Sequence, residues 1–368
     1  MFDRDDLRAA VSADILSADQ ASRLEAFLTS RHAAGDDAGQ ETLRFLSNFN
    51  DIFVTIGIGI LFVGITALSG ILFGPSATVG NPAVLLLMFA PVALAALALL
   101  EYFCARRRML LPSMALSCIF VASAATGMAG VFAQGMGADV SGFWDAFQSV
   151  GILGMATFAS AFLAAIFIFW RYRLPFSLLL AALAATGVAY AGAATLGETG
   201  VIFGGGLSLL MGLATFAAAI WFDMRDPERI RRASDHAFWL HAAAAPQLIL
   251  GISALSTGSN MFFGATLGAD NAFQGIVLLS TLVLMGLIAL ALNRRALIAA
   301  SLLTFIWTLG FVLNEAGMDG LGVFMTVTMV VGGGVVLLGA GWKTARRIVL
   351  RLFPNGGIWD RLFPPEIA

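Results

Sequence analysis

Residues 150–196 read VGILGMATFASAFLAAIFIFWRYRLPFSLLLAALAATGVAYAGAATL, which is two long apolar runs on either side of a short basic turn. A helix needs about 20 apolar residues to cross roughly 30 Å of hydrocarbon, and each run comes near that length. Strands are not a serious alternative, because the runs lack apolar/polar alternation and greatly exceed the roughly 10 residues of a barrel strand. The stretch therefore predicts two transmembrane helices joined at one membrane surface.

Eight further apolar runs extend this pattern along the chain. The ten expected spans are 51–74, 82–104, 110–134, 150–170, 174–196, 200–222, 235–257, 272–292, 296–314 and 320–342. Composition agrees, since 59% of the residues are hydrophobic and only 12% are charged, whereas soluble domains are about a quarter charged. The predicted fold class is an all-α, polytopic transmembrane bundle that forms one membrane domain. An inverted five-plus-five arrangement, common among transporters, is compatible with ten spans but receives no clear support from the sequence.

The 21 Lys and Arg residues all fall on one side of these spans. The two termini and the connections after even-numbered spans carry them, and the connections after odd-numbered spans hold no base at all. Cytoplasmic connections are enriched in Lys and Arg, so both termini are predicted to be cytoplasmic. The first six residues include three Asp and one Arg and no apolar core, so no cleavable signal peptide is expected.

The two ends of the chain differ from the membrane domain at 51–342. Residues 1–50 predict a cytoplasmic helical leader, in which Ser17 and Gln20 are spaced as a capping box. This leader either covers the membrane domain or docks a cytosolic protein partner, and the first is the plainer interpretation. Residues 343–368 place Arg346, Arg347 and Arg351 beside apolar residues. Such a tail is expected to lie at the interface and to contact membrane lipids through their anionic headgroups.

The seventh span is the most polar and holds most of the candidate ligand-binding residues. It opens with SDHAFWLH at 234–241, in which Ser234 or Asp235 is placed to cap the helix. His241 lies about two turns into the helix, so it either hydrogen-bonds a neighbouring helix or lines a cytoplasm-facing cavity. Gln247 lies about 240° around the helix from His241, so the two are not expected to share a site.

The remaining candidates are His236 in the same span, and Glu101 and Asp51 near the cytoplasmic ends of the second and first spans. Arg106, Arg107 and Arg108 follow Glu101 closely, so ion pairing is its expected role. The three histidines lack the spacing of metal ligands, the two cysteines imply no disulfide, and no phosphate-binding or hydrolase motif occurs. No metal, cofactor or nucleic-acid partner is therefore predicted.

The motif at 234–241 with Ala244-Ala245-Pro246, and LGAGW at 338–342 before two arginines, resembles an uncharacterised group of polytopic inner-membrane proteins of Gram-negative bacteria. The helical leader is similar to leaders in bacterial membrane families classed only as domains of unknown function. This chain departs from the pattern at Ala242-Ala243, where bulkier aliphatic residues are usual. The resemblance implies a bacterial inner-membrane location and brings no activity with it.

Two functions follow as hypotheses. The leading one is a protein that binds or moves a small or lipid-like solute through a cytoplasm-facing cavity near the seventh span. No Asp, Glu, Lys or Arg falls in the central third of any span, which disfavours an ion-driven antiporter. The alternative is a non-transporting scaffold or sensor that engages a cytosolic partner through its leader. An intramembrane enzyme is the weakest hypothesis, because no paired acid and base can be named. Substrate and oligomeric state are not specified.

Overall fold

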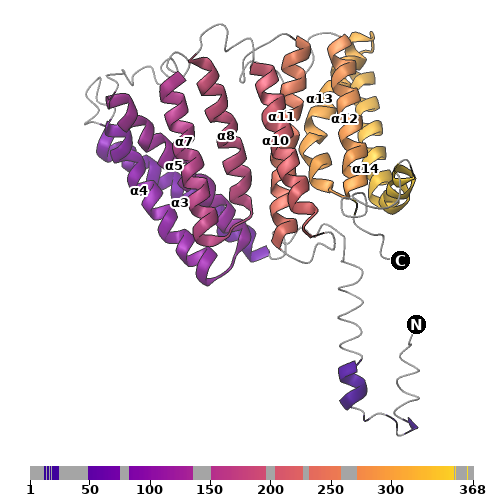
Figure 1. Cartoon of the computed structure of the whole chain (residues 1–368), viewed down its shortest axis with the longest axis horizontal. Helices are drawn as coiled ribbons and strands as arrows, with labels where there is room; N and C mark the ends of the chain where they lie inside the picture. Colours follow the sequence, from indigo (N-terminus) through magenta and orange to yellow (C-terminus); the bar gives the residue numbers. More distant parts are fainter. Residues whose placement is uncertain are drawn as a thin grey trace.

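The computed structural model describes residues 49–74, 83–135, 151–195, 204–226, 232–257 and 272–351, together with 12–13, 15, 17, 19–24, 353 and 363. Over these residues the chain forms helices and no strand, which confirms the all-α class. The long helices stand side by side (Figure 1). They are α3 (Phe49–Phe73), α4 (Ala83–Leu100), α5 (Leu110–Gly135), α7 (Gly151–Tyr172), α8 (Phe176–Ala194), α10 (Gly204–Asp223), α11 (Arg232–Thr257), α12 (Ala272–Leu292), α13 (Arg295–Glu315) and α14 (Gly320–Leu350).

Nine helices in the described part of the chain are long and apolar enough to cross a membrane. Their outward faces carry large apolar side chains such as Ile60, Leu163 and Met329, which are mostly exposed. Apolar surface of this extent is rare on soluble monomers, and hydrocarbon accommodates it. The chain is thus a multi-pass membrane protein. The helix α13 occupies the ninth predicted span but is not among the nine, so a tenth crossing stays a prediction.

Several helix ends differ from the predicted ones. A six-residue π-helical stretch, η3 (Glu101–Arg106), prolongs α4. The helix α11 begins at Arg232 and continues through Pro246. The helix α14 runs for 31 residues to Leu350, so residues 343–350 extend the last helix. Apolar periodicity continues across a membrane surface, and for that reason it locates a span better than it locates a helix end.

The leader is described only in part, but its capping box is confirmed. The Ser17 amide donates to Gln20 Oε1 at 3.0 Å, and the Gln20 amide donates to Ser17 Oγ at 3.2 Å. The predicted contacts of the rest of the leader, and of the tail after residue 353 apart from Phe363, lie outside the described residues.

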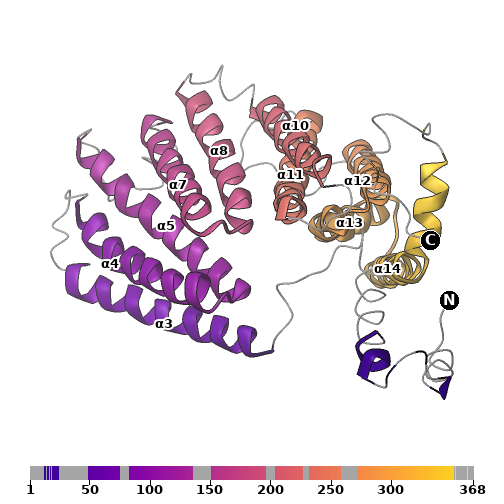
Figure 2. The same ribbon diagram turned by 60° about the horizontal axis from the view of Figure 1, so that its bottom comes forward.

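The long helices of the described residues divide into two groups, which Figure 2 shows apart from one another. The first group, α3 to α8, shares one apolar core that includes Phe62, Leu100 and Ile168. The second group, α10 to α14, has adjoining cores around Ile249 and around Trp342. The groups meet where α8 packs against α10 and α11. We call this contact the group boundary.

Short turns join α4 to α5, α7 to α8 and α12 to α13 at one end of the bundle (Figure 1). Each of these turns contains a non-glycine residue in the left-handed region, namely Arg108, Arg173 and Asn293, with φ of 54° to 56°. The residue that follows points back into the bundle in two of them, because Leu174 is 2% exposed and Arg294 is 1% exposed. The turn geometry that buries a leucine between α7 and α8 thus buries an arginine between α12 and α13.

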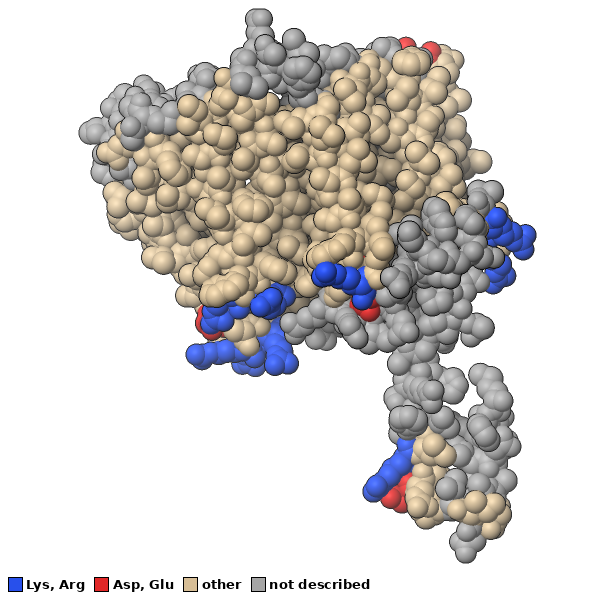
Figure 3. Space-filling view, viewed as in Figure 1, with Lys and Arg blue, Asp and Glu red and all other residues tan. Residues whose placement is uncertain are grey.

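Charge is distributed unevenly between the two ends of the helices. Figure 3 shows Lys and Arg side chains gathered at the end where these hairpin turns lie. Glu315 ends α13 and Asp319 caps α14 at the opposite end. The arrangement agrees with the one-sided pattern of the sequence, while the assignment of the base-rich end to the cytoplasm stays a prediction.

Candidate functional site

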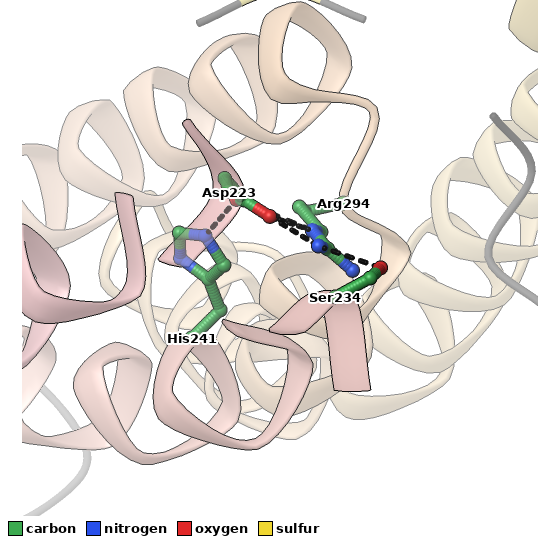
Figure 4. A network of polar contacts seen from close by, with 4 residues as sticks. All are labelled: Asp223, Ser234, His241 and Arg294. Atoms are coloured by element: carbon green, nitrogen blue, oxygen red, sulfur yellow. Dashed lines mark hydrogen bonds and ion pairs between the residues drawn. The ribbon is translucent and has the colours of Figure 1, made fainter. Parts of the chain in front are cut away.

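A buried ionic cluster joins α10, α11 and the turn between α12 and α13 (Figure 4). Its members are Asp223, the last residue of α10; Ser234 and His241 of α11; and Arg294, which directly precedes α13. His241 is fully buried, and the other three side chains are at most 8% exposed. The cluster therefore lies inside the second group of helices.

Asp223 is the centre of the cluster. Its Oδ2 lies 2.8 Å from His241 Nε2. Arg294 Nε donates to Oδ1 at 3.1 Å and to Oδ2 at 3.3 Å, and Arg294 Nη2 also donates to Oδ1. The same Nη2 donates to Ser234 Oγ at 3.1 Å. One carboxylate is thus shared by a permanent cation and by an imidazole that is charged only when protonated.

The local structure explains why these charges need one another. Asp223 ends α10, where the negative end of the helix dipole disfavours a carboxylate. Arg294 is buried by the turn after Asn293, and an unpaired buried cation costs several kcal/mol. Either charge alone would destabilise the fold, and the ion pair offsets both of these costs. The edge contact of His241 with Phe216, at 5.3 Å between ring centroids, fixes the imidazole beside them.

A second buried polar group, Gln247, lies at the middle of α11 on the group boundary. Its Nε2 donates to Thr186 Oγ1 at 2.9 Å and to the Ala182 carbonyl at 3.3 Å, both on α8. Thr186 Oγ1 itself donates to the Ala182 carbonyl at 2.9 Å, so it accepts from the amide nitrogen. This network sets the orientation of the amide and leaves Oε1 as the remaining acceptor.

Gln247 Oε1 is buried and accepts no hydrogen bond from the residues that the structure describes. The side chain is only 2% exposed, so lipid headgroups and bulk water do not reach it. A buried acceptor without a donor costs about 1–3 kcal/mol. Ser208 of α10 donates to the Gln247 backbone carbonyl at 3.0 Å, which adds a third helix to this boundary site. The site therefore has room in its hydrogen bonding for one more donor.

The structure places the predicted residues of α11 as follows. His241 hydrogen-bonds a neighbouring helix, the first of the two roles expected for it. It and Gln247 bond to different helices, as their positions around α11 imply. The prediction that Ser234 or Asp235 caps the helix is wrong, because α11 begins earlier, at Arg232. His236 lies between Phe169 and Phe222, with ring centroids 5.3 and 5.2 Å away.

Glu101 and Asp51 belong to the first group of helices and lie apart from the ionic cluster. The ion pair of Glu101 is with Arg171, whose Nη2 is 2.9 Å from each carboxylate oxygen. The expected pairing of Glu101 with the bases at 106–108 is therefore corrected, since α7 brings a cation closer than the chain's own next turn does. Asp51 is buried in the first turn of α3, where its backbone carbonyl accepts from Thr55 Oγ1 at 2.6 Å.

Asp223 and Arg294 were not among the predicted site residues. Both read as ordinary interfacial charges, because each adjoins the membrane end of an apolar run. The available signal was the aspartate itself, which ends a helix whose dipole opposes it. Nothing in the sequence indicates that Arg294, the first of two consecutive arginines, turns inward. Among the described residues, no group of three His, Cys, Asp or Glu is placed to hold a metal ion.

An apolar groove of about 770 Å³ lies between α13 and α14. Phe311, Val323 and Val327 line it, and Asn314 is at the end away from the hairpin turns. Its lining residues come from these two helices, so it is not the cavity expected beside α11, which stays a prediction.

No family model, no curated protein and no solved structure matches this chain. The geometry alone therefore carries the functional argument.

Proposed function

We propose that the protein is a membrane transporter that moves a small or lipid-like solute along the boundary between its two groups of helices. The observation that carries the proposal is Gln247, which is buried near the middle of α11 on this boundary, and whose Oε1 accepts no hydrogen bond from the described residues. Transporters place substrate-binding groups near the bilayer midplane between two halves of the fold. A solute that donates a hydrogen bond to Oε1 would complete the pairing of this side chain.

The distribution of cores supports relative motion of the two groups. Each group has its own buried apolar core. Side-chain contacts across the boundary include the Gln247–Thr186 hydrogen bond and the Phe176–Trp239 pair, with ring centroids 4.8 Å apart. The ionic cluster lies wholly within the second group, so a rearrangement of the boundary does not itself break these contacts. Rigid-body rocking of one half against the other is the usual form of alternating access.

The proposed setting is the bacterial inner membrane, with ten crossings and both termini in the cytoplasm. Aromatic and basic side chains pair at the base-rich end, as is typical of a membrane surface. Arg225 lies over the Trp221 ring at 3.4 Å from its centroid, and Arg171 lies over Tyr172 at 5.1 Å. Arginines in such a belt attract anionic headgroups.

An uptake assay tests this function. The purified protein is reconstituted into proteoliposomes and offered a panel of solutes. We expect at least one solute to be taken up and to raise the melting temperature of the detergent-solubilised protein. Gln247→Leu should lower uptake about tenfold, the equivalent of one hydrogen bond. Gln274→Leu is the matched control, since Gln274 is a buried glutamine on α12 that donates to Ser256 of α11 within the second group.

Absence of both uptake and thermal shift across the panel would refute the transporter. That result favours the non-transporting scaffold that engages a cytosolic partner through residues 1–50. Equal loss of uptake in both glutamine variants would instead show that Gln247 contributes only to packing.

A further inference from the structure

We propose that His241 is the proton-binding site of this protein, and that its protonation competes with Arg294 for the Asp223 carboxylate. The binding of the proton stands on the ionic cluster alone. Its coupling to transport rests on the proposed function. Histidine is the side chain that ordinarily changes charge between pH 5 and 8, and it is the member of the cluster that is charged only when protonated.

The contacts of Asp223 identify the nitrogen that takes the proton. The carboxylate accepts from Arg294 and has no proton of its own to give, so the imidazole donates to Oδ2 through Nε2–H over 2.8 Å. The neutral ring then has its lone pair on Nδ1. A hydronium ion transfers its proton to Nδ1, one O–H bond breaks as one N–H bond forms, and the ring gains one positive charge.

The helices around α11 supply few other charges. The helix α11 packs against α8, α10, α12 and α13. Neither α8 nor α12 contains a charged residue, and α10 contains only Asp223. The charges at α13 are Arg294 and Arg295 at its start and Glu315 at its other end, and α11 itself has Arg232, Asp235 and His236 in its first turns. Asp223 is the carboxylate that bonds His241.

Protonation therefore changes the balance of the cluster. With a neutral ring, one carboxylate faces one guanidinium and the formal charges cancel. With an imidazolium, two cations share one carboxylate in a buried site, where uncompensated charge is costly. Arg294 has Ser234 as a second partner, so its hold on Asp223 weakens first. Because Arg294 directly precedes α13, the proton loosens the tie between α10 and the α12–α13 turn.

A purely structural ion pair would not need the histidine. Asp223 and Arg294 already neutralise each other, and the His241 ring packs against the apolar Phe216 ring. An apolar side chain would pack in this position without burying a polar ring. Ionisable groups buried within transmembrane helices commonly mark proton relays and ion pathways.

Histidine-selective NMR of the full chain in nanodiscs tests the proton site without any solute. The chain has three histidines, so His32→Asn and His236→Asn assign the His241 ring by elimination, even where His241→Asn fails to fold. We expect the His241 signal to move from its neutral to its cationic position between pH 5 and 8. A signal that stays constant over this range overturns the proposal.

Two further arms test competition and coupling. Arg294→Gln removes the competing cation, so the pH midpoint of the His241 signal should change, whereas Glu101→Gln, in the other group, should leave it unchanged. An unchanged midpoint in Arg294→Gln overturns the competition.

In proteoliposomes, an inward proton gradient should accelerate solute uptake by the wild type about tenfold. An uptake rate that does not depend on the gradient overturns the coupling. Titration without any uptake leaves the proton site standing and refutes the transporter.

Discussion

Burial determines how much the Asp223–Arg294 and Glu101–Arg171 ion pairs contribute to the stability of the fold. Asp223 and Arg294 are 6% and 1% exposed, whereas the side chains of Glu101 and Arg171 are 43% and 46% exposed. Removing one partner of a buried pair leaves an uncompensated charge and costs about 3–5 kcal/mol. Exposed pairs contribute about 0–1 kcal/mol, because water already solvates both ions.

We accordingly expect Asp223→Asn to lower the free energy of unfolding by about 3–5 kcal/mol. Glu101→Gln, its matched control at an exposed pair, should change it by less than about 1 kcal/mol. Denaturant unfolding in mild detergent measures both. Similar losses in the two variants would contradict the buried position of the cluster.

The double variant Asp223→Asn with Arg294→Gln provides a second check at this scale. Removing both charges leaves no unpaired ion, so the double variant should be more stable than Asp223→Asn alone, with a coupling energy of about 0.5–3 kcal/mol. Strictly additive losses, measured in the same unfolding experiment, would show that the two side chains do not interact.

Asn293 occupies a strained backbone position with φ of 54° and accepts a hydrogen bond from Trp342 Nε1 at 2.6 Å. Asn293→Ala loses this bond and keeps a side chain disfavoured in the left-handed region, whereas Asn293→Gly loses only the bond. The alanine variant should be less stable by about 1 kcal/mol, the usual penalty for a Cβ in this conformation. Equal melting curves for the two variants would mean that the turn adopts another conformation.

At the residue scale, the sequence identified His241 and Gln247 but not their partners. Their polarity within an apolar helix marks them at once. No such signal identifies their partners Asp223, Arg294 and Thr186, because a charge beside an apolar run is common and so is a threonine within one. Their role depends on which helices become neighbours, and hydropathy does not encode that.

Glycines control how closely α10 and α11 approach. A Cβ on Gly251 would lie 2.5 Å from the Leu209 amide nitrogen, and one on Gly212 would lie 2.9 Å from the Leu248 amide nitrogen. Backbone atoms cannot move aside as a flexible side chain does. The triple glycine at 332–334 has nothing within 4 Å of the added Cβ positions among the described residues. The glycines that allow this close packing are therefore isolated in the sequence, and a search for clusters of glycine would miss them.

Gly251→Ala should destabilise the protein by about 1–3 kcal/mol, as other overpacked positions do. Gly286→Ala is its control, because no described atom lies within 4 Å of the added Cβ on α12. There the alanine should be neutral or stabilise the helix by up to about 1 kcal/mol. Thermal unfolding of both variants in one detergent compares them directly, and a tolerated Gly251→Ala would contradict the close approach.

Helix positions along the chain were largely predictable, whereas helix contacts were not. Each long helix coincides with a predicted apolar run, since the need to cover about 30 Å of hydrocarbon leaves a strong compositional signal. The division of the described helices into two groups leaves no such signal. It depends on buried residues such as Gln247, whose partners are known only from the fold.

The orientation of the whole molecule is a separate prediction. In a chain whose native Cys104 and Cys118 are replaced by serine, Asp139→Cys should react with a membrane-impermeant maleimide applied to intact cells. Arg107→Cys should react only after the membrane is opened, because base-rich connections stay in the cytoplasm. The reverse labelling pattern would contradict the assignment of both termini to the cytoplasm.

Relative motion of the two groups is the central claim at the scale of the molecule, and a crosslink across their boundary tests it most directly. In the same cysteine-free background, Phe176→Cys with Trp239→Cys joins α7–α8 to α11, where the native rings are 4.8 Å apart. Phe158→Cys with Gly187→Cys is the control within the first group, because a Gly187 Cβ lies 2.4 Å from the Phe158 ring. We predict that a short bis-thiosulfonate reagent, which bridges two thiols through two disulfides, stops solute uptake only across the boundary and that a reductant restores it. Undiminished uptake with the boundary crosslinked would contradict the account.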